Sequence, residues 1–337
     1  MKGGTTTKIL LEVIMLTALR NIPSHIEQLT APTEGSAEAC DSDCTTDLPT
    51  IQQCTHLMHM YETVLKETYP QAMAEGLAQV IDWGGVSLNS GGHIYYIGGD
   101  SLGVLGLVDA SECQPTFGAN VEDIRGFLFG GYDSLENREG NLLLSAFPPV
   151  QSLLPIETKI RSVCDMAAQP PAGGNSLQIS AEYFSNTLVY TLTPADTVIF
   201  LTSSSGSLPH TMRVLSTLVQ TRCHQVAVFA CYKDVCETQD VLPQYFKHIL
   251  RICIPITHHI RDFLGKTDTQ DPWWFDLIGV VAARRFAAEL SCKLLLNAVS
   301  TGAHIRRGKV FHNLMVDLKL SNSKLFKRGI EIVKVRF

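Results

Sequence analysis

Two short segments carry the residue types best suited to bind an anion. The first is the glycine-rich turn Gly98–Gly103, which follows the apolar run 93–97 and precedes a helical stretch. Glycines let backbone N–H groups face a ligand closely, and the positive end of the following helix favours a phosphate. The candidate phosphate-binding residues in this turn are Gly98, Gly99, Ser101 and Gly103.

The second segment is a run of serines directly after the apolar stretch 197–202. Its candidate phosphate ligands are Ser203, Ser205 and Gly206, through hydroxyl and backbone N–H donors. In an open parallel sheet, ligands bind beyond the carboxyl ends of the strands, so both segments are expected at one sheet edge. Taken alone, a run of serines is also typical of a polar turn without a ligand.

The side chains of the first turn conflict with its geometry. Asp100 places a carboxylate inside it, and Leu102 offers no hydrogen-bond donor. At roughly 4 Å from a phosphate oxygen, the repulsion would be on the order of a few kcal/mol at an effective dielectric constant of 20. The sequence therefore predicts the backbone geometry of a phosphate pocket, with side chains that no longer favour a phosphate.

One acidic pair could catalyse proton transfer. Asp109 and Glu112 are three residues apart, which places them on one helix face or at its end. A desolvated Glu112 would suit a general base, whereas the alternative is a helix carboxylate that bonds only to backbone. Catalysis by Glu112 is therefore expected only if the chain is an enzyme.

Composition narrows the class of protein. The 337 residues are 45% hydrophobic and 18% charged, which suits one large or two modest globular domains. The net charge of -6 gives no sign of a nucleic-acid partner, and no apolar run reaches the roughly 18 residues of a membrane span. The ten cysteines lack a metal-ligand spacing, so buried thiols are expected, with neither a metal nor a cofactor.

The apolar pattern predicts an α/β fold. Runs this apolar suit strands buried on both faces, in a parallel sheet covered by helices. The expected strands are 93–98, 125–129, 197–202, 225–231 and 251–255, the last ended by Pro255. The expected helices are two within 51–80, separated at Tyr69–Pro70, one long helix over 275–304 and another within 313–332, and the stretch 165–182 is expected to be a loop.

A segment near the start of the chain is similar in sequence to a segment near its end. The segment Thr7–Glu12 matches Cys292–Asn297, a pattern that hints at a duplicated domain of which the first copy keeps only its closing helix. So apolar a helix must dock on the rest of the chain or leave an apolar patch exposed. The expected organisation is that closing helix (1–30), a linker (31–50), a helical lead-in (51–88), the main domain (89–320) and the start of a C-terminal helical region (321–337).

Several motifs together resemble the sugar isomerase (SIS) family. They are Asp-Ala-Ser-Glu-Cys-x-Pro-Thr-Phe-Gly from Asp109, the stretches 297–302 and 313–317, and Asn-Ser-Lys-Leu-Phe from Asn322. The resemblance is narrower to the group that holds bacterial N-acetylmuramic acid 6-phosphate etherases and animal glucokinase regulatory proteins. It implies a three-layer α/β/α fold with a five-stranded parallel sheet, flanked by extra helices.

Most of the residues that the etherases use for catalysis and phosphate binding are replaced at the matching positions of this chain. The family's first catalytic glutamate falls on Glu112, but its second falls near Leu142, which cannot titrate. Its Gly-Thr-Ser phosphate triplet falls on Asp100–Leu102, and the Arg-Thr after the second loop becomes Ser207–Leu208. A carbon–oxygen lyase is therefore the alternative interpretation, and a non-enzyme the main one.

The N-terminal and C-terminal segments resemble the glucokinase regulatory proteins more than the etherases. By resemblance, the regulatory proteins bind fructose 6-phosphate or fructose 1-phosphate, mainly through their first SIS domain, and inhibit glucokinase in the cytoplasm and nucleus. Their glucokinase contact includes a Leu-Ser-Thr triplet, which corresponds here to Leu290, Ser291 and Cys292. From the residues alone, Leu290 is an apolar helix position that suits the core.

Overall fold

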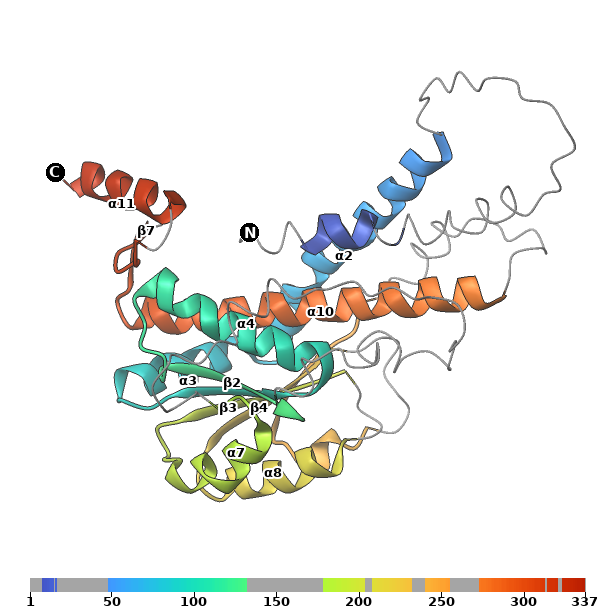
Figure 1. Cartoon of the computed structure of the whole chain (residues 1–337). Helices are drawn as coiled ribbons and strands as arrows, with labels where there is room; N and C mark the ends of the chain where they lie inside the picture. The colour runs from blue at the N-terminus through green and yellow to red at the C-terminus, as the bar shows by residue number, and fades with distance from the viewer. Residues whose placement is uncertain are drawn as a thin grey trace, which may run out of the picture.

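The computed structural model of the chain describes residues 8–14, 16, 48–131, 178–203, 208–231, 240–254, 273–312, 314–320 and 323–336. Within these residues, five parallel strands form one sheet in the order β2-β1-β3-β4-β5 (Figure 1). The strands are β1 (Ile94–Gly98), β2 (Ile124–Leu128), β3 (Thr197–Thr202), β4 (Gln225–Cys231) and β5 (His248–Ile252). The predicted parallel sheet is confirmed, with the last strand shifted toward the N-terminus and Pro255 outside the described residues.

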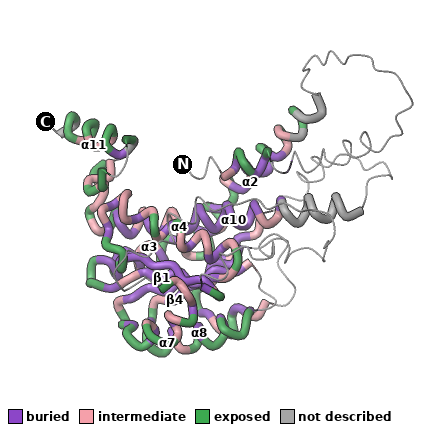
Figure 2. Tube along the Cα trace, in the orientation of Figure 1, coloured by how far each residue is buried: buried purple, intermediate pink, exposed green. Residues whose placement is uncertain are grey.

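Burial on both faces accounts for the apolar runs of the central strands β1 and β3. Every residue of β1, β2 and β3 is buried, and Figure 2 shows the burial throughout the centre of the sheet. Alternate side chains of a strand point to opposite faces, so full burial requires a covering layer on both sides. At the sheet edge, β5 is less completely covered and has partly exposed positions.

Two apolar cores lie on the two faces of the sheet. On one face, Ile94 and Tyr96 pack with residues from α3 (Leu77–Asn89), α4 (Asp100–Phe117) and α10 (Trp273–Arg306). On the other face, Tyr95 and Ile97 pack with residues from α7 (Ala181–Asn186) and α8 (His210–Gln220). These two cores confirm the expected three-layer α/β/α architecture.

A third core joins the start of the chain to α10. The N-terminal helix (residues 8–14) contributes Ile9 and Val13, which pack with residues of α2 (Leu48–Ala74) and with Leu290 and Leu294 of α10. Its opposite face remains in solvent, where Leu10, Leu11 and Ile14 are between 56% and 60% exposed. The helix therefore docks on α2 and α10 and also leaves an apolar face exposed.

The helix interruption predicted at Tyr69–Pro70 is wrong. Pro70 lies inside α2, on an exposed part of its surface, and α2 continues to Ala74. The break instead comes at Gly76, whose φ of 97° places it in the left-handed region that glycine adopts without steric cost. Proline removes one helical hydrogen bond, and in this long, packed helix that loss does not end it.

The helix predicted within 313–332 is also wrong at its start. A short hairpin of β6 (Val310–Phe311) and β7 (Leu314–Met315) comes first, and α11 (Ser323–Arg336) follows it. His312, at the hairpin turn, has a φ of 51°, which a continuous helix does not allow. In Figure 1, α11 stands apart from the sheet.

Two smaller observations complete the fold. Ala181 and Glu182, at the end of the stretch expected to be a loop, begin α7 after Ser180, whose side chain accepts a hydrogen bond from the N–H of Tyr183. Among the described helices, none combines the length and apolarity that a bilayer crossing requires.

The C-terminal end of α10 is fastened through His304. Its ring stacks on Phe117 with centroids 4.2 Å apart, and its Nδ1 lies 2.7 Å from the carbonyl oxygen of Ser300. One turn further, Arg307 forms an ion pair of 2.6 Å with Asp123, next to the start of β2. Burial of the imidazole lowers the pKa of His304.

This lowered pKa predicts a pH-dependent loss of stability. Because the folded state resists protonation of His304, its contribution is complete above the ordinary histidine pKa of 6.5 and is lost as pH falls through the lower folded-state pKa. We expect the unfolding free energy to fall less steeply below pH 6.5 in His304→Phe than in the wild type. Urea unfolding at several pH values checks this. The exposed His59→Gln variant should keep the wild-type slope, and an unchanged slope in His304→Phe would contradict the assignment.

Candidate functional site

The glycine-rich turn is built by the close approach of α4 to the sheet. β1 ends at Gly98, Gly99 caps α4, and the N–H of Gly103 donates a 2.9 Å hydrogen bond to the carbonyl of Gly99. A Cβ added at Gly103 would lie 2.5 Å from the carbonyl oxygen of Gly98. The N-terminus of α4, which is its positive end, therefore lies at the carboxyl end of β1. This is the geometry predicted for an anion site.

The second segment leaves the sheet beside the first. β1 and β3 are neighbours in register, with Gly98 opposite Leu201, so the turn after β1 and the residues after Thr202 emerge at the same edge. Ser203 is half-buried there. Ser205 and Gly206 lie outside the described residues, so their predicted part in the site stays a prediction.

The side chains of the first turn have separate environments. Asp100 is exposed and begins α4 with a φ of 51°, while Leu102 is buried in the core beneath the turn. Ser101 is half-buried, and its hydroxyl lies close enough to Glu289 on α10 to lower the pKa of that carboxylate. A second carboxylate, far away in the sequence, therefore contacts the one hydroxyl of the turn.

Glu289 belongs to a charged cluster that sequence reasoning missed. Lys8 Nζ lies 2.6 Å from Glu289 Oε2 and also pairs with Glu12, while Arg285 Nε lies 3.1 Å from Glu289 Oε1. The hydroxyl of Tyr61 donates a 2.8 Å hydrogen bond to Glu12. The pairs Lys8–Glu12 and Arg285–Glu289 are visible in the sequence as helical i,i+4 pairs, but Lys8 and Glu289 are 281 residues apart, which no local pattern connects.

Asp109 and Glu112 both lie within α4, away from its ends. Asp109 is fully buried and accepts a 3.3 Å hydrogen bond from the hydroxyl of Tyr96, whose pKa is raised first by burial and then by the Asp109 charge. Glu112 is half-buried on the following turn. Asp109 therefore serves the core, and Glu112 is the less buried residue of the pair.

The predicted partner-binding triplet lies in the core. Leu290, Ser291 and Cys292 have exposed fractions of 0%, 1% and 0%. Leu290 packs under the N-terminal helix and α2, and Ser291 Oγ lies 3.1 Å from Thr68 Oγ1 of α2. A direct contact between these side chains and another protein would require the covering helices to move, so their role in partner binding stays a prediction.

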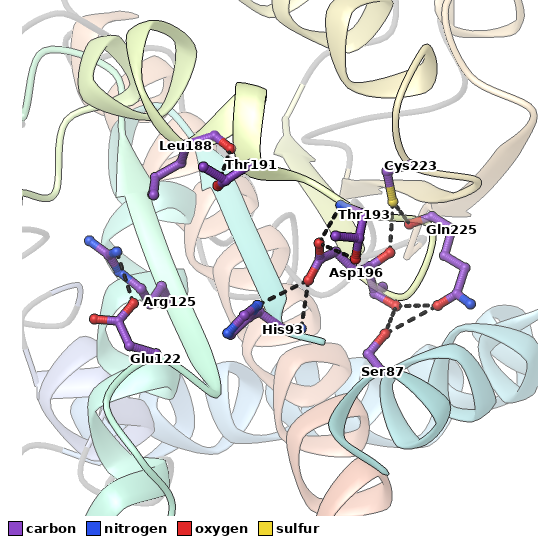
Figure 3. Close-up of polar contacts among 11 residues, drawn as sticks. Ser87, His93, Glu122, Arg125, Leu188, Thr191, Thr193, Asp196, Cys223 and Gln225 are labelled. Atoms are coloured by element: carbon purple, nitrogen blue, oxygen red, sulfur yellow. Dashed lines mark hydrogen bonds and ion pairs between the residues drawn. The ribbon is translucent and has the colours of Figure 1, made fainter. Parts of the chain in front are cut away.

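A further polar cluster lies at the opposite ends of the strands (Figure 3). Asp196, just before β3, accepts hydrogen bonds from the N–H groups of His93 and Thr193 at 2.8 and 2.7 Å. Beside it, Ser87 Oγ lies 2.7 Å from Thr197 Oγ1, and both bond Gln225. These contacts tie the starts of neighbouring strands together, and their position away from the carboxyl ends gives them a structural part.

No metal centre forms in the described part of the chain, where no group of three or more His, Cys, Asp and Glu side chains is arranged to hold an ion. Cys223 is one of the buried thiols, and burial raises its pKa to about 11.

The architecture and the relatives point to the same class. A three-layer sandwich with a five-stranded parallel sheet, and a glycine-rich turn leading into a helix at its edge, is the SIS fold. The family model for the second SIS domain of glucokinase regulatory protein matches residues 71–152. Two lines of curated relatives agree with the resemblance inferred from the motifs.

The first group of relatives consists of glucokinase regulatory proteins. Glucokinase regulatory protein of Xenopus laevis is 30% identical over 99% of this chain, and that of Homo sapiens is 27% identical over 99%. The chain spans 43% and 42% of the lengths of these two proteins. The second line is enzymatic: N-acetylmuramic acid 6-phosphate etherase of Gloeobacter violaceus is 29% identical over 78% of this chain and 66% of its own length.

The close approach at the turn makes a stability prediction. Gly103→Ala would force its new methyl group into the backbone of Gly98, so we expect a loss of about 1–3 kcal/mol in the free energy of unfolding. Gly99→Ala is the matched control, because its Cβ would meet only the Phe129 ring at 3.4 Å. We expect it to lose under about 1 kcal/mol. Urea unfolding compares the two, and equal losses would refute the close approach as the cause.

Proposed function

We propose that this chain is a non-catalytic regulatory protein that binds and inhibits glucokinase in the cytoplasm and nucleus, and that in a full-length protein its action responds to fructose 6-phosphate or fructose 1-phosphate. The observation that carries the proposal is the similarity to glucokinase regulatory proteins over 99% of the chain, together with the match to their second SIS domain. The altered turn supports it, because two carboxylates, Asp100 and Glu289, lie beside the Ser101 hydroxyl where a phosphate would bind.

The direct test is a calorimetric titration of the purified chain with glucokinase, with and without fructose 6-phosphate. We expect saturable binding and a reduced rate of glucose phosphorylation. Absence of binding, both by a chain that unfolds cooperatively and by the same region within a longer protein, would remove the proposal.

The buried triplet allows a sharper test of how a partner is bound. Ser291→Ala and Thr68→Ala each remove one side of the same 3.1 Å hydrogen bond, so Ser291→Ala should lower the free energy of unfolding by about 1 kcal/mol. Thr68→Ala should cost at least as much, because the Thr68 hydroxyl also donates a 2.6 Å hydrogen bond to the carbonyl of Val64. If Ser291 acts only through packing, both variants should change glucokinase affinity equally. A loss of affinity confined to Ser291→Ala would show a direct contact instead.

A lyase that cleaves the lactyl ether of an amino-sugar 6-phosphate is the second candidate. The etherase relatives favour it, as does Glu112, which is half-buried on α4 at the position of the family's first catalytic glutamate. We expect no lactate release from N-acetylmuramic acid 6-phosphate. Turnover by the wild type that disappears in Glu112→Gln would reverse the order of the two candidates.

A further inference from the structure

The carboxylate of Glu289 sits in a ring of hydrogen-bond donors at the glycine-rich turn. Lys8 Nζ lies 2.6 Å and Arg285 Nε lies 3.1 Å from its oxygens, and the third donor is the nearby Ser101 hydroxyl, which helps to lower the pKa of Glu289. We call these three donors the Glu289 cradle. They come from α4, the N-terminal helix and α10, so the cradle exists only because distant segments meet beside the turn.

The Glu289 cradle has the composition of an oxyanion site. It combines two cationic side chains and one hydroxyl, which are groups that proteins use to bind phosphate. Glu289 itself is nine-tenths buried, whereas the side chains of Lys8 and Arg285 are 20% and 16% exposed. The lysine and arginine donors are therefore partly exposed to solvent, while the carboxylate that they bind is buried between them.

We propose that the Glu289 cradle is an oxyanion-binding site, suited to a phosphate group, that the protein fills with its own Glu289 carboxylate. The carboxylate accepts from the same donors that an external anion would use. A phosphate can enter only by displacing it. The site is thus closed by an internal ligand, and this inference does not depend on glucokinase binding.

The ionisation of the two acids near Lys8 agrees with this arrangement. Burial alone would raise the pKa of Glu289, but the charge and hydrogen bond of Lys8, the Ser101 hydroxyl and the charge of Arg285 hold it below its usual range. Burial prevails for Glu12, whose pKa is raised despite the same lysine. Glu289 is therefore the acid held as an anion, as an internal ligand must be.

The charge balance indicates which substitution opens the site. With both acids ionised, Glu12 and Glu289 balance Lys8 and Arg285, and an entering phosphate meets no net positive charge. Glu289→Gln removes one negative charge, and Glu289→Ala also removes the bulk that occupies the cradle. Each change leaves the donors without the carboxylate that they now bind.

Isothermal titration with inorganic phosphate tests the proposal. We expect Glu289→Ala and Glu289→Gln to bind phosphate at least about tenfold more tightly than the wild type, because a unit charge a few Å away is removed from a poorly solvated site. Adding Lys8→Met to either variant should abolish the gain. If a variant is too unstable for calorimetry, thermal unfolding replaces it, since a ligand that binds only the folded state raises the Tm.

The matched control is Glu62→Gln. Glu62 also pairs with a lysine one helical turn away, Lys66 at 2.6 Å, but on an exposed surface. It should leave phosphate affinity at the wild-type value. Two results would overturn the proposal: phosphate affinity in the Glu289 variants no greater than in Glu62→Gln, or a gain that persists in the presence of Lys8→Met.

Discussion

The close backbone approach between α4 and the sheet determines the geometry of the candidate site. Cβ atoms added at Gly103, Gly106 and Gly126 would come within 3.0 Å of the backbone of Gly98, of Tyr96 Cβ and of the Leu107 backbone. Such contacts leave no room for side chains between α4 and strands β1 and β2. The start of α4 is therefore held where β1 ends by this close backbone packing, whichever side chains occupy the exposed position 100 and the half-buried position 101. For this reason an anion-site geometry can persist while its chemistry changes.

The sheet was predictable because its signal is local and strong. The central strands β1, β3 and β4 are short apolar runs buried on both faces, and the sequence predicts four of the five strands to within a residue of their bounds. The helix boundaries were less predictable, since they depend on competing effects. Pro70 looked like the break in the lead-in, yet the packed α2 tolerates it, and the unremarked Gly76 ends the helix through its positive φ.

The candidate site was only half predictable. The position of the segment 98–103 between a strand and a helix can be read from local sequence, and the structure shows β1 ending at Gly98 and α4 beginning already at Asp100. The contact of Ser101 with Glu289 could not be inferred, because it depends on how α10 crosses the sheet. The sequence pointed to Asp100 as the disruptive carboxylate. Asp100 is instead exposed at the N-terminus of α4, where a negative charge stabilises the helix, and Glu289 is the acid that contacts the turn.

One helix, α10, links the turn to the core beneath the N-terminal helix. Glu289 reaches Ser101, and the next residue, Leu290, is buried under the N-terminal helix and α2. The same N-terminal helix supplies Lys8 to Glu289, so the charged cluster and the apolar core hold it on α10 together. A protein that binds over this region meets the covering helices first. The influence of residues 290–292 on such a partner would then pass through the placement of those helices rather than through their own side chains.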